Sequence, residues 1–341
     1  MRRGTPLDVH DGAKMGTFAG VQMPLWYEGI RAEHLAVRNG AGMFDVSHMA
    51  VWWLQGEPAV VLDALETVGC AKVAKRAKRG LMTYSMILNE EGGVVDDVMM
   101  GQVGDRWLMV SNASNAGQVL PRFQGKDGIH VSRSTGAMIA IQGPSVMGMI
   151  REWGWPSIAP FGVVQFAVGG DDVVVSRTGY TGEDGVEVVG SAIVLTELWG
   201  RCCHAGVARC GLAARDSLRI EAGLPLYGHE LNEDITPLET RYSWVLSSER
   251  AYVGQGALRT RDFTEAKTTV GLQLETKAIA RQGAVIQEGG IVTSGTLVPN
   301  HDHSIAMAMV PRSLSGIGTL VHVMIRDTPV VARVVPLPFN E

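Results

Sequence analysis

The stretch "DDVVVSRTGYTGEDGVEVV", residues 171–189, places a glycine-rich acidic loop between two short apolar runs. A dinucleotide-binding loop leads from a strand into a helix, because the helix N-terminus must meet the pyrophosphate. Here a second strand follows instead, and the carboxylates of Glu183 and Asp184 would repel a phosphate. The stretch therefore predicts a β-hairpin, and with it an antiparallel sheet rather than a doubly wound parallel one.

The acids of this stretch allow two interpretations. Asp and Gly suit a solvated tight turn for conformational reasons alone. A carboxylate in such a loop could instead accept two parallel N–H groups from the edge of a ligand. The residues by themselves leave both interpretations open.

The rest of the chain is typical of an α+β protein. Short apolar runs separated by Gly and Asp turns fill residues 81–176 and indicate antiparallel sheet. Amphipathic helices are predicted at residues 192–206 and 212–223, and Pro58 is placed to begin another. From about residue 270 only short strands with Gly turns follow, which predicts a C-terminal all-β barrel.

The chain is long enough for more than one core, since it has 341 residues. We expect a discontinuous first α+β domain from residues 1–54 with 148–248. A second α+β domain is expected at 55–147 and the barrel at 265–341, with the linker to the barrel within 247–267.

Charge and apolar patterning argue against several classes of protein. Thirty Lys and Arg residues stand against 35 Asp and Glu residues, so we expect no nucleic-acid partner. No apolar window approaches the roughly 20 residues that cross a bilayer, and the N-terminus has no apolar signal segment. Cys70, Cys202, Cys203 and Cys210 lack metal-site spacing, which predicts free thiols in a cytoplasmic protein.

Adjacent Asp96 and Asp97 lie inside an apolar run. Neighbouring side chains of a strand point to opposite faces, so one carboxylate must face inward unless the strand is at an edge in water. A buried carboxylate is costly without a partner and often marks a functional site. Arg215 and Arg219, one helical turn apart, allow a similar choice between ion pairs along the helix and the anchoring of a ligand or of Glu187.

Two further clusters carry charge or metal-binding side chains. The basic run from Lys72 to Arg79 predicts a solvated helix face or a docking surface for an acidic partner. His301, Asp302 and His303 stand in a loop without a third ligand in register, so no metal site is expected there.

Several long strings, in one order, resemble the aminomethyltransferase family, the T protein of the glycine cleavage system. The resemblance extends over nearly the whole chain. The strings are "TPLDVHDGAKMGTFAGVQMPLWYEGIRAEHLAVRNGAGMFDVSHM", "YSMILNEEGGVVDD", "RTGYTGEDGVEV", "CGLAARDSLRIEAGLPLYGHEL" and "PVVARVVPLPF".

The resemblance implies a multidomain α+β fold around a central site for tetrahydrofolate, the one-carbon acceptor. The implied donor is the aminomethyl group on the lipoyl arm of the H protein; N5 of tetrahydrofolate takes its methylene carbon and ammonia leaves. Glu187 and Arg215 would contact the N–H edge of the pteridine ring. Asp97, the candidate catalytic acid, would stabilise the cation that develops beside N5 and N10. The other matched positions are Tyr84, Val110, Asn112, Met49 and Tyr180 around the ring and Trp244 beside the folate tail.

Three departures from the family pattern leave the donor open. Thr269 replaces an arginine that grips the folate glutamate, no aromatic residue follows Phe339, and Gly254-Gln255 lacks the usual basic residue. The main alternative is a tetrahydrofolate-dependent demethylase acting on a small N-, S- or O-methyl donor. The other is a folate-binding accessory protein for iron–sulfur maturation, but "RAYVGQGAL" has no cysteine in the motif of that branch.

Overall fold

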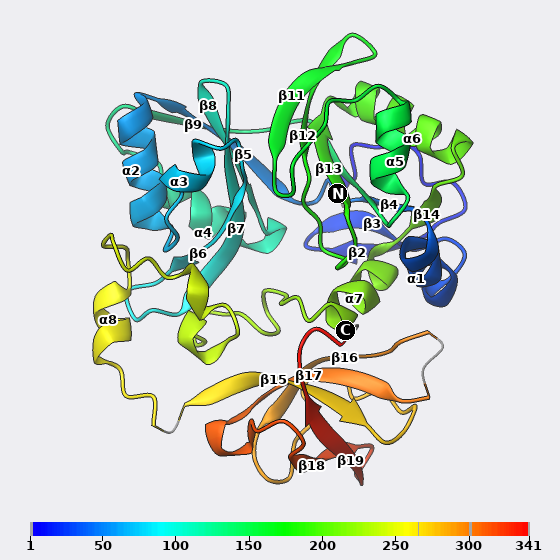
Figure 1. Ribbon diagram of the computed structural model, residues 1–341, viewed down its shortest axis with the longest axis vertical. Coiled ribbons are helices and arrows are strands. Elements are labelled where there is room, and N and C mark those ends of the chain that lie inside the picture. The colour runs from blue at the N-terminus through cyan, green and yellow to red at the C-terminus, as the bar shows by residue number, and fades with distance from the viewer. Residues whose placement is uncertain (1–2, 265, 300–301, 340–341) are drawn as a thin grey trace. The chain divides into compact units, whose positions relative to one another are not determined.

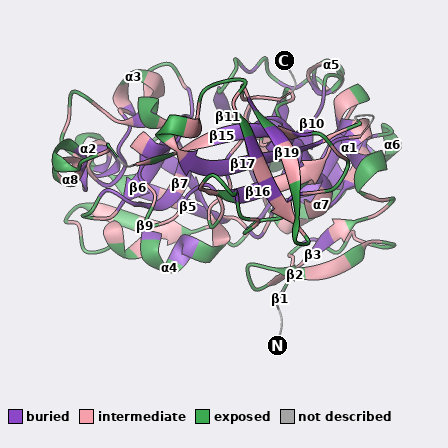
Figure 2. Ribbon diagram, turned by 90° about the horizontal axis from the view of Figure 1, so that it is seen from below, coloured by how far each residue is buried: buried purple, intermediate pink, exposed green. Residues whose placement is uncertain are grey.

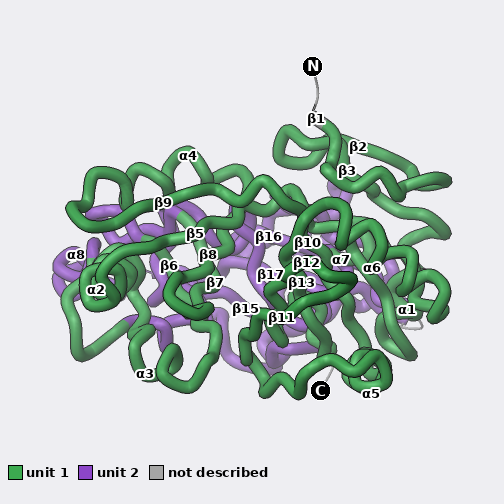
Figure 3. The backbone as a smooth tube through the Cα atoms, turned by 90° about the horizontal axis from the view of Figure 1, so that it is seen from above, with its two compact units in different colours: residues 1–87, 96–215, 247–252 green, residues 88–95, 216–246, 253–341 purple. Residues whose placement is uncertain are grey.

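The computed structural model describes residues 3–264, 266–299 and 302–339 (Figure 1). The chain forms two compact units (Figure 3). The first contains residues 1–87, 96–215 and 247–252, and the second contains residues 88–95, 216–246 and 253–341. Buried residues are concentrated on the strands of the sheets (Figure 2).

The first unit contains a six-stranded sheet built around the predicted hairpin, with the order β11-β12-β13-β10-β4-β14. β12 and β13 pair antiparallel, which confirms the hairpin, and only β14 runs parallel to its neighbour, β4. Helices α5 and α6 pack on this sheet through a shared apolar core (Figure 1). The elements are β4 (Gly42–Asp45), β10 (Ala137–Gln142), α5 (Val146–Glu152), β11 (Val163–Val168), β12 (Asp171–Ser176), β13 (Gly185–Gly190), α6 (Ala192–His204) and β14 (Ala208–Cys210).

A five-stranded sheet in the order β6-β7-β8-β5-β9 carries the acid pair on β7. Its elements are β5 (Ala50–Gly56), α2 (Pro58–Val68), α3 (Ala74–Ala77), β6 (Thr83–Leu88), β7 (Val94–Val103), β8 (Arg106–Ser111), η1 (Ala113–Asn115), α4 (Ala116–Val119), η2 (Leu120–Arg122) and β9 (Ile129–Arg133). Pro58 begins α2, as predicted, because a helix start needs no N–H at that position.

The two sheets of the first unit are joined by backbone hydrogen bonds. Met82 N donates to Phe161 O at 2.7 Å, and Val163 N donates to Gly80 O at 2.9 Å. The chain also begins in this unit, with β1 (Arg3–Gly4), β2 (Lys14–Phe18) and β3 (Val21–Trp26) in a small sheet, followed by α1 (Ile30–Asn39). The six-stranded sheet and most of the five-stranded sheet thus belong to one compact unit.

The second unit is dominated by the C-terminal sheet, whose five strands have the antiparallel order β16-β17-β15-β19-β18. Its apolar core includes Leu272, Ala308 and Val323. The elements are β15 (Lys267–Leu274), β16 (Ile291–Leu297), β17 (Ser304–Pro311), η5 (Arg312–Leu314), β18 (Leu320–Ile325) and β19 (Thr328–Val335). The α+β fold with antiparallel sheets, flanking helices and a C-terminal barrel-like sheet is thus confirmed.

In the sequence, four helical elements follow β14 and precede β15. They are α7 (Leu212–Glu221), η3 (Pro237–Glu239), η4 (Ser243–Val245) and α8 (Gln255–Thr260). α8 falls inside residues 247–267, where the sequence predicted only a linker, and Gly254 provides the left-handed residue that precedes it. The proposed division into three domains stays a prediction. None of the helices in the described ranges combines the length and the apolar character needed to traverse a bilayer.

Candidate functional site

The acids of the hairpin loop are neutralised by arginines. Arg38 Nη1 donates to Glu183 Oε1 at 3.0 Å, and Arg177 Nε donates to Asp184 Oδ1 at 2.9 Å. The hydrogen bond from Arg177 holds the pKa of Asp184 below its usual range. These two acids therefore have partners within the chain.

Two glycines of the same stretch are needed for close packing. A Cβ atom at Gly179 would lie 1.8 Å from Gln142 Oε1, and one at Gly185 would lie 2.3 Å from Ile141 O. Gln142 is itself fixed by Thr181, whose hydroxyl donates to Oε1 at 3.0 Å. Packing within the chain accounts for these glycines, and the predicted approach of a ligand to the loop stays a prediction.

Glu187 lies on β13, opposite Ala140 on one neighbour and Ser176 on the other. Its side chain is 13% exposed. The Thr178 hydroxyl donates to Oε2 at 2.7 Å, and Arg215 Nη2 lies 3.8 Å from Oε1. The carboxylate is thus held in place while Oε1 keeps the capacity to accept further N–H groups.

Arg215 lies in the first turn of α7, and its side chain is 12% exposed. The guanidinium carbon is 4.9 Å from the ring centroid of Tyr180 and 6.0 Å from that of Phe44. Burial lowers the pKa of Arg215, and the charge of Glu187 opposes that shift. Within the described ranges, Nη1 is buried and has no hydrogen-bond partner. The sequence allowed either an ion pair along the helix or the anchoring of a ligand or of Glu187 by Arg215. The structure shows the ion pair with Glu187.

His48 follows β4 in the first unit and is a buried histidine that the sequence pattern did not indicate. It is 6% exposed, and its ring packs edge-on against Phe18 with 5.2 Å between the centroids. Burial, together with the nearby charge of Arg215, lowers the pKa of His48 to about 4. Its Nδ1, like Arg215 Nη1 and Trp199 Nε1, is a buried nitrogen without a hydrogen-bond partner among the described residues. A histidine inside the apolar string "MFDVSHM" resembles a core residue, so the sequence contained no signal for it.

Asp96 and Asp97 share one amide group. Asn112 Nδ2 donates to Asp96 Oδ1 and to Asp97 Oδ1, at 2.7 Å each. Asn115 Nδ2 donates to Asp96 Oδ1 at 2.9 Å, and Tyr84 Oη donates to Asp97 Oδ2 at 3.0 Å. Asp96 is the inward carboxylate, fully buried, whereas Asp97 is half-buried. Strand alternation thus identified one inward acid, but it did not show that both acids meet at Asn112.

The environment of the pair favours proton binding. Burial raises the pKa of Asp96 to about 7, and the charge of Asp97 acts in the same direction. Burial also raises the pKa of Asp97, against the hydrogen bonds from Asn112 and Tyr84, which lower it. Two adjacent carboxyl groups with raised pKa values can hold a proton near neutral pH and pass it to a reacting group.

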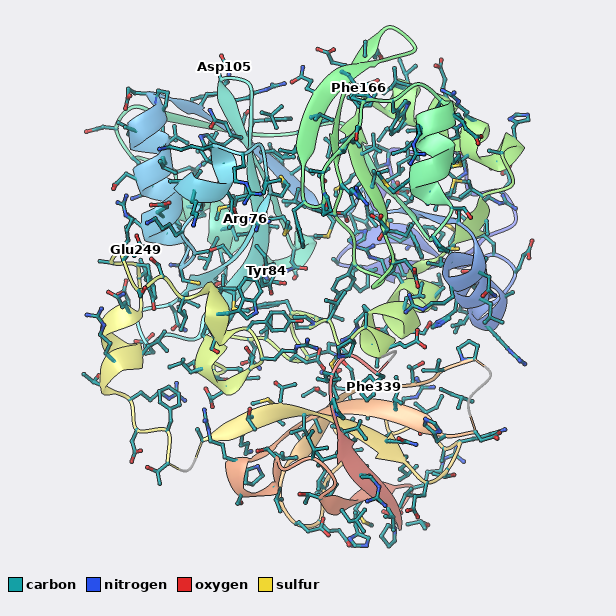
Figure 4. All side chains as sticks on the ribbon, viewed as in Figure 1. Arg76, Tyr84, Asp105, Phe166, Glu249 and Phe339 are labelled. Atoms are coloured by element: carbon teal, nitrogen blue, oxygen red, sulfur yellow. The ribbon has the colours of Figure 1, made fainter. Side chains whose placement is uncertain are left out.

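The matched residues thus form two clusters in the first unit. Tyr84 and Asn112 contact Asp97, and Tyr180 and Arg215 lie with Glu187. Figure 4 labels Tyr84 on the sheet that carries the acid pair. Val110 is buried on β8, and Met49 is half-buried just before β5.

Trp244 differs from the other matched residues because it belongs to the second unit. It is 67% exposed, and its ring centroid is 6.4 Å from that of Tyr242. Its predicted place beside the folate tail stays a prediction.

The cysteines and histidines of the described ranges contribute to no metal-binding group. Among the described residues, no group of three or more His, Cys, Asp or Glu side chains is placed to hold a metal ion. His301 lies outside the described residues, and Asp302 pairs with Lys277 at 2.8 Å. The four cysteines are free, and burial raises the pKa of Cys70 to about 11, which disfavours the reactive thiolate.

The basic run divides into structural and exposed members. Lys72 pairs with Glu249. Arg76 donates from Nε to Met82 O at 2.9 Å, and its guanidinium covers the ring of Phe161. Figure 4 labels Arg76 and Glu249. The remaining cations, which are exposed, are Lys75, Lys78 and Arg79.

Comparison with protein families identifies the fold. The GCVT N-terminal domain matches residues 6–250, and the glycine cleavage T-protein C-terminal barrel domain matches residues 267–340. The chain belongs to the glycine cleavage T-protein family. The family predicted from the sequence is therefore confirmed, and with it the prediction that the chain belongs to a family of enzymes, the aminomethyltransferases.

Individual relatives of this family match the chain over nearly its full length. The aminomethyltransferase of Rubrobacter xylanophilus is 41% identical, covering 99% of this chain and 94% of the relative. That of Herpetosiphon aurantiacus is 38% identical, covering 98% and 97%. The crystal structure of the glycine cleavage system aminomethyltransferase T from Bartonella henselae superposes with a TM-score of 0.91 at 32% identity, covering 100% of this chain and 99% of that one.

Proposed function

We propose that this chain transfers the methylene group of aminomethyl-lipoate, carried by the H protein, to tetrahydrofolate in the cytoplasm. The products are 5,10-methylenetetrahydrofolate, ammonia and the reduced lipoyl arm. Family membership supports the type of reaction. The observation that carries the choice of acceptor is the Glu187 carboxylate, held by Thr178 and Arg215 beside the ring of Tyr180.

The residues around Glu187 fit the edge of a flat heterocycle. A carboxylate accepts two parallel N–H groups in one plane, as an aminopyrimidine edge presents them. The aromatic ring of Tyr180 and the guanidinium of Arg215 offer flat surfaces at the same place. Buried polar atoms without partners, such as Arg215 Nη1, are further positions where a ligand can bind.

Asp97 is the candidate for the chemical step. Tyr84 and Asn112 fix its carboxylate, so no reorganisation is needed when positive charge develops at the transferred carbon. Such fixed charges contribute on the order of several kcal/mol to the stabilisation of a transition state. A carboxyl group with a raised pKa can also supply the proton that ammonia carries away.

The lipoylated H protein is the proposed partner because the methylene group must arrive on a carrier arm. Lys75, Lys78 and Arg79 form an exposed basic surface on and beside α3. We assign docking to this surface, since an acidic carrier would be attracted to it over a distance of about 8 Å at physiological salt.

Calorimetry of tetrahydrofolate binding tests the acceptor. Glu187→Gln keeps the shape of the side chain but removes the charge that pairs with the N–H groups. Affinity should fall by about 30-fold or more, which corresponds to at least about 2 kcal/mol. Glu183→Gln is the matched control, because Glu183 forms an ion pair with Arg38. This variant should bind tetrahydrofolate with the affinity of the wild type. Equal affinities of Glu187→Gln and wild type would refute the assignment.

A further inference from the structure

Phe161 occupies a backbone position that glycine or asparagine usually takes. Gly162 N donates to Ala159 O at 2.6 Å and closes a tight turn. Pro160 is the second residue of this turn and Phe161 the third, with a φ angle of 64°. The left-handed region is unfavourable for a residue with a Cβ atom, and a bulky side chain there is a true outlier. Strain of this kind persists chiefly at functional positions.

The side chain of Phe161 adds little to the apolar core, because the residue is 50% exposed. The guanidinium of Arg76 lies 5.1 Å from the centroid of its ring. Arg76 is held independently of this contact, since its Nε donates to Met82 O at 2.9 Å. Cation–π contacts at exposed sites are weak. Packing within the chain therefore does not account for an exposed aromatic residue in a turn that glycine would fit.

Phe161 lies beside the basic run, and both belong to the first unit. Leu81 forms a β-bridge with Gly162, the neighbour of Phe161. Arg79, two residues before Leu81, is exposed, and Arg76 covers the aromatic ring. Phe161, Arg76 and Arg79 are here named the Phe161 surface. Aromatic residues and arginine are the residue types that carry most of the binding energy at protein–protein interfaces.

The Phe161 surface is also close to the candidate catalytic acid. Phe161 O accepts a hydrogen bond from Met82 N at 2.7 Å, and Tyr84 follows two residues later on β6. A strand advances about 3.4 Å per residue, so Met82 and Tyr84 are roughly 7 Å apart. The Tyr84 hydroxyl donates to Asp97 Oδ2 at 3.0 Å. A carrier that binds at Phe161 would therefore stand beside the group proposed for the chemical step.

We propose that the Phe161 surface is the centre of the docking site for the H protein. The ring is the apolar anchor, and Arg76 and Arg79 bind carboxylates of the carrier, since their charge selects an acidic partner. The tight turn fixes the backbone beneath the ring, so little ordering is needed when the partner binds. The inference rests on the proposed function and extends the basic docking surface to Phe161.

Steady-state assays with aminomethylated H protein test this role of Phe161. Phe161→Gly suits the left-handed turn but removes the ring. Its Tm should not fall below that of the wild type, whereas its KM for the H protein should rise by about 10-fold or more. Its KM for tetrahydrofolate should not change. Phe161→Tyr keeps the ring and should keep the KM of the wild type. Ile193→Ala is the matched control, because Ile193 is a 71% exposed apolar residue on α6 of the same unit, and its loss should not affect this KM.

The outcomes separate this inference from the function on which it rests. If the wild type consumes loaded H protein but Phe161→Gly has the same KM for it, the inference fails and the proposed function stands. A lower Tm of Phe161→Gly, or an equal rise of KM for both substrates, would show that the ring supports the fold and would also overturn the inference. Failure of the wild-type chain to consume loaded H protein would overturn both.

Discussion

Asp96 should bind a proton in the folded chain once the pH falls below about 7. It is fully buried on β7, beside the charge of Asp97, and these surroundings raise its pKa from 3.8 to about 7. Because the folded-state pKa is above the unfolded-state value, the folded chain binds the proton more tightly. The stabilisation associated with this proton is complete below about pH 4 and is lost as the pH rises to about 7.

The size of the effect follows from the shift. The pKa of Asp96 shifts by about three units, and each unit is worth about 1.36 kcal/mol. The free energy of unfolding should therefore fall by on the order of 4 kcal/mol as the pH rises from below the unfolded-state pKa to above the folded-state pKa. His48 acts with the opposite sign, because its pKa is lowered to about 4 and its protonation opposes folding as the pH falls below about 6.5. A comparison of wild type with Asp96→Asn cancels the contribution of His48 and isolates that of Asp96.

Infrared difference spectroscopy measures the proton directly. The carbonyl band of the protonated Asp96 carboxyl should be present in wild type near pH 6, weaker in Asp96→Asn, and half lost near pH 7 in a titration of wild type. Asp97→Asn should move this midpoint to lower pH, because it removes the neighbouring charge. Asp184→Asn is the control, since that carboxyl is paired with Arg177 and has a lowered pKa.

A wild-type midpoint below about pH 5, or one that Asp97→Asn does not lower, would refute this reasoning. The first result would mean that the hydrogen bonds from Asn112 and Asn115 lower the pKa of Asp96 enough to cancel most of the rise caused by burial. The second would mean that the two carboxyl groups do not interact.

Two other predictions concern turnover and docking. Asp97→Asn should fold normally and lose about 100-fold or more in kcat. Asp96→Asn should lose less kcat, because Asp97 is the more exposed acid of the pair. The reverse ranking in steady-state assays would contradict the assignment. Simultaneous replacement of Lys75, Lys78 and Arg79 by alanine should raise KM for the H protein and make this KM less dependent on salt. Folate affinity should not change. An unchanged KM would place docking elsewhere.

Local patterns in the sequence were sufficient for much of the fold. The loop at residues 177–184 predicted a hairpin because its glycines lead to a strand, and Pro58 fixed the start of α2. The barrel-like sheet followed from the regular alternation of short strands and turns after residue 270. Residues 255–260 were missed as a helix because they are few and follow Gly254 in a segment rich in turn residues.

The site was harder to predict because its properties depend on contacts between distant residues. Glu183 and Asp184 looked as available as Glu187 until the structure placed Arg38 and Arg177 beside them. Local alternation could not show that Asn112, 15 residues after Asp97, binds both acids.

The signals of single side chains were equally limited. The missing partner of His48 Nδ1 has no signature in a one-dimensional pattern. The family resemblance supplied the identity of the acceptor, which neither spacing nor composition contains.

The most direct test of the central claim is a single-turnover assay with aminomethylated H protein and tetrahydrofolate. The purified chain should release ammonia and form 5,10-methylenetetrahydrofolate in equal amounts, one of each for every loaded carrier consumed, and Asp97→Asn should slow both together. Parallel reactions supply free sarcosine, dimethylglycine or a sulfonium donor in place of the H protein. Product from one of these small donors, with none from loaded H protein, would contradict the account and identify a tetrahydrofolate-dependent demethylase.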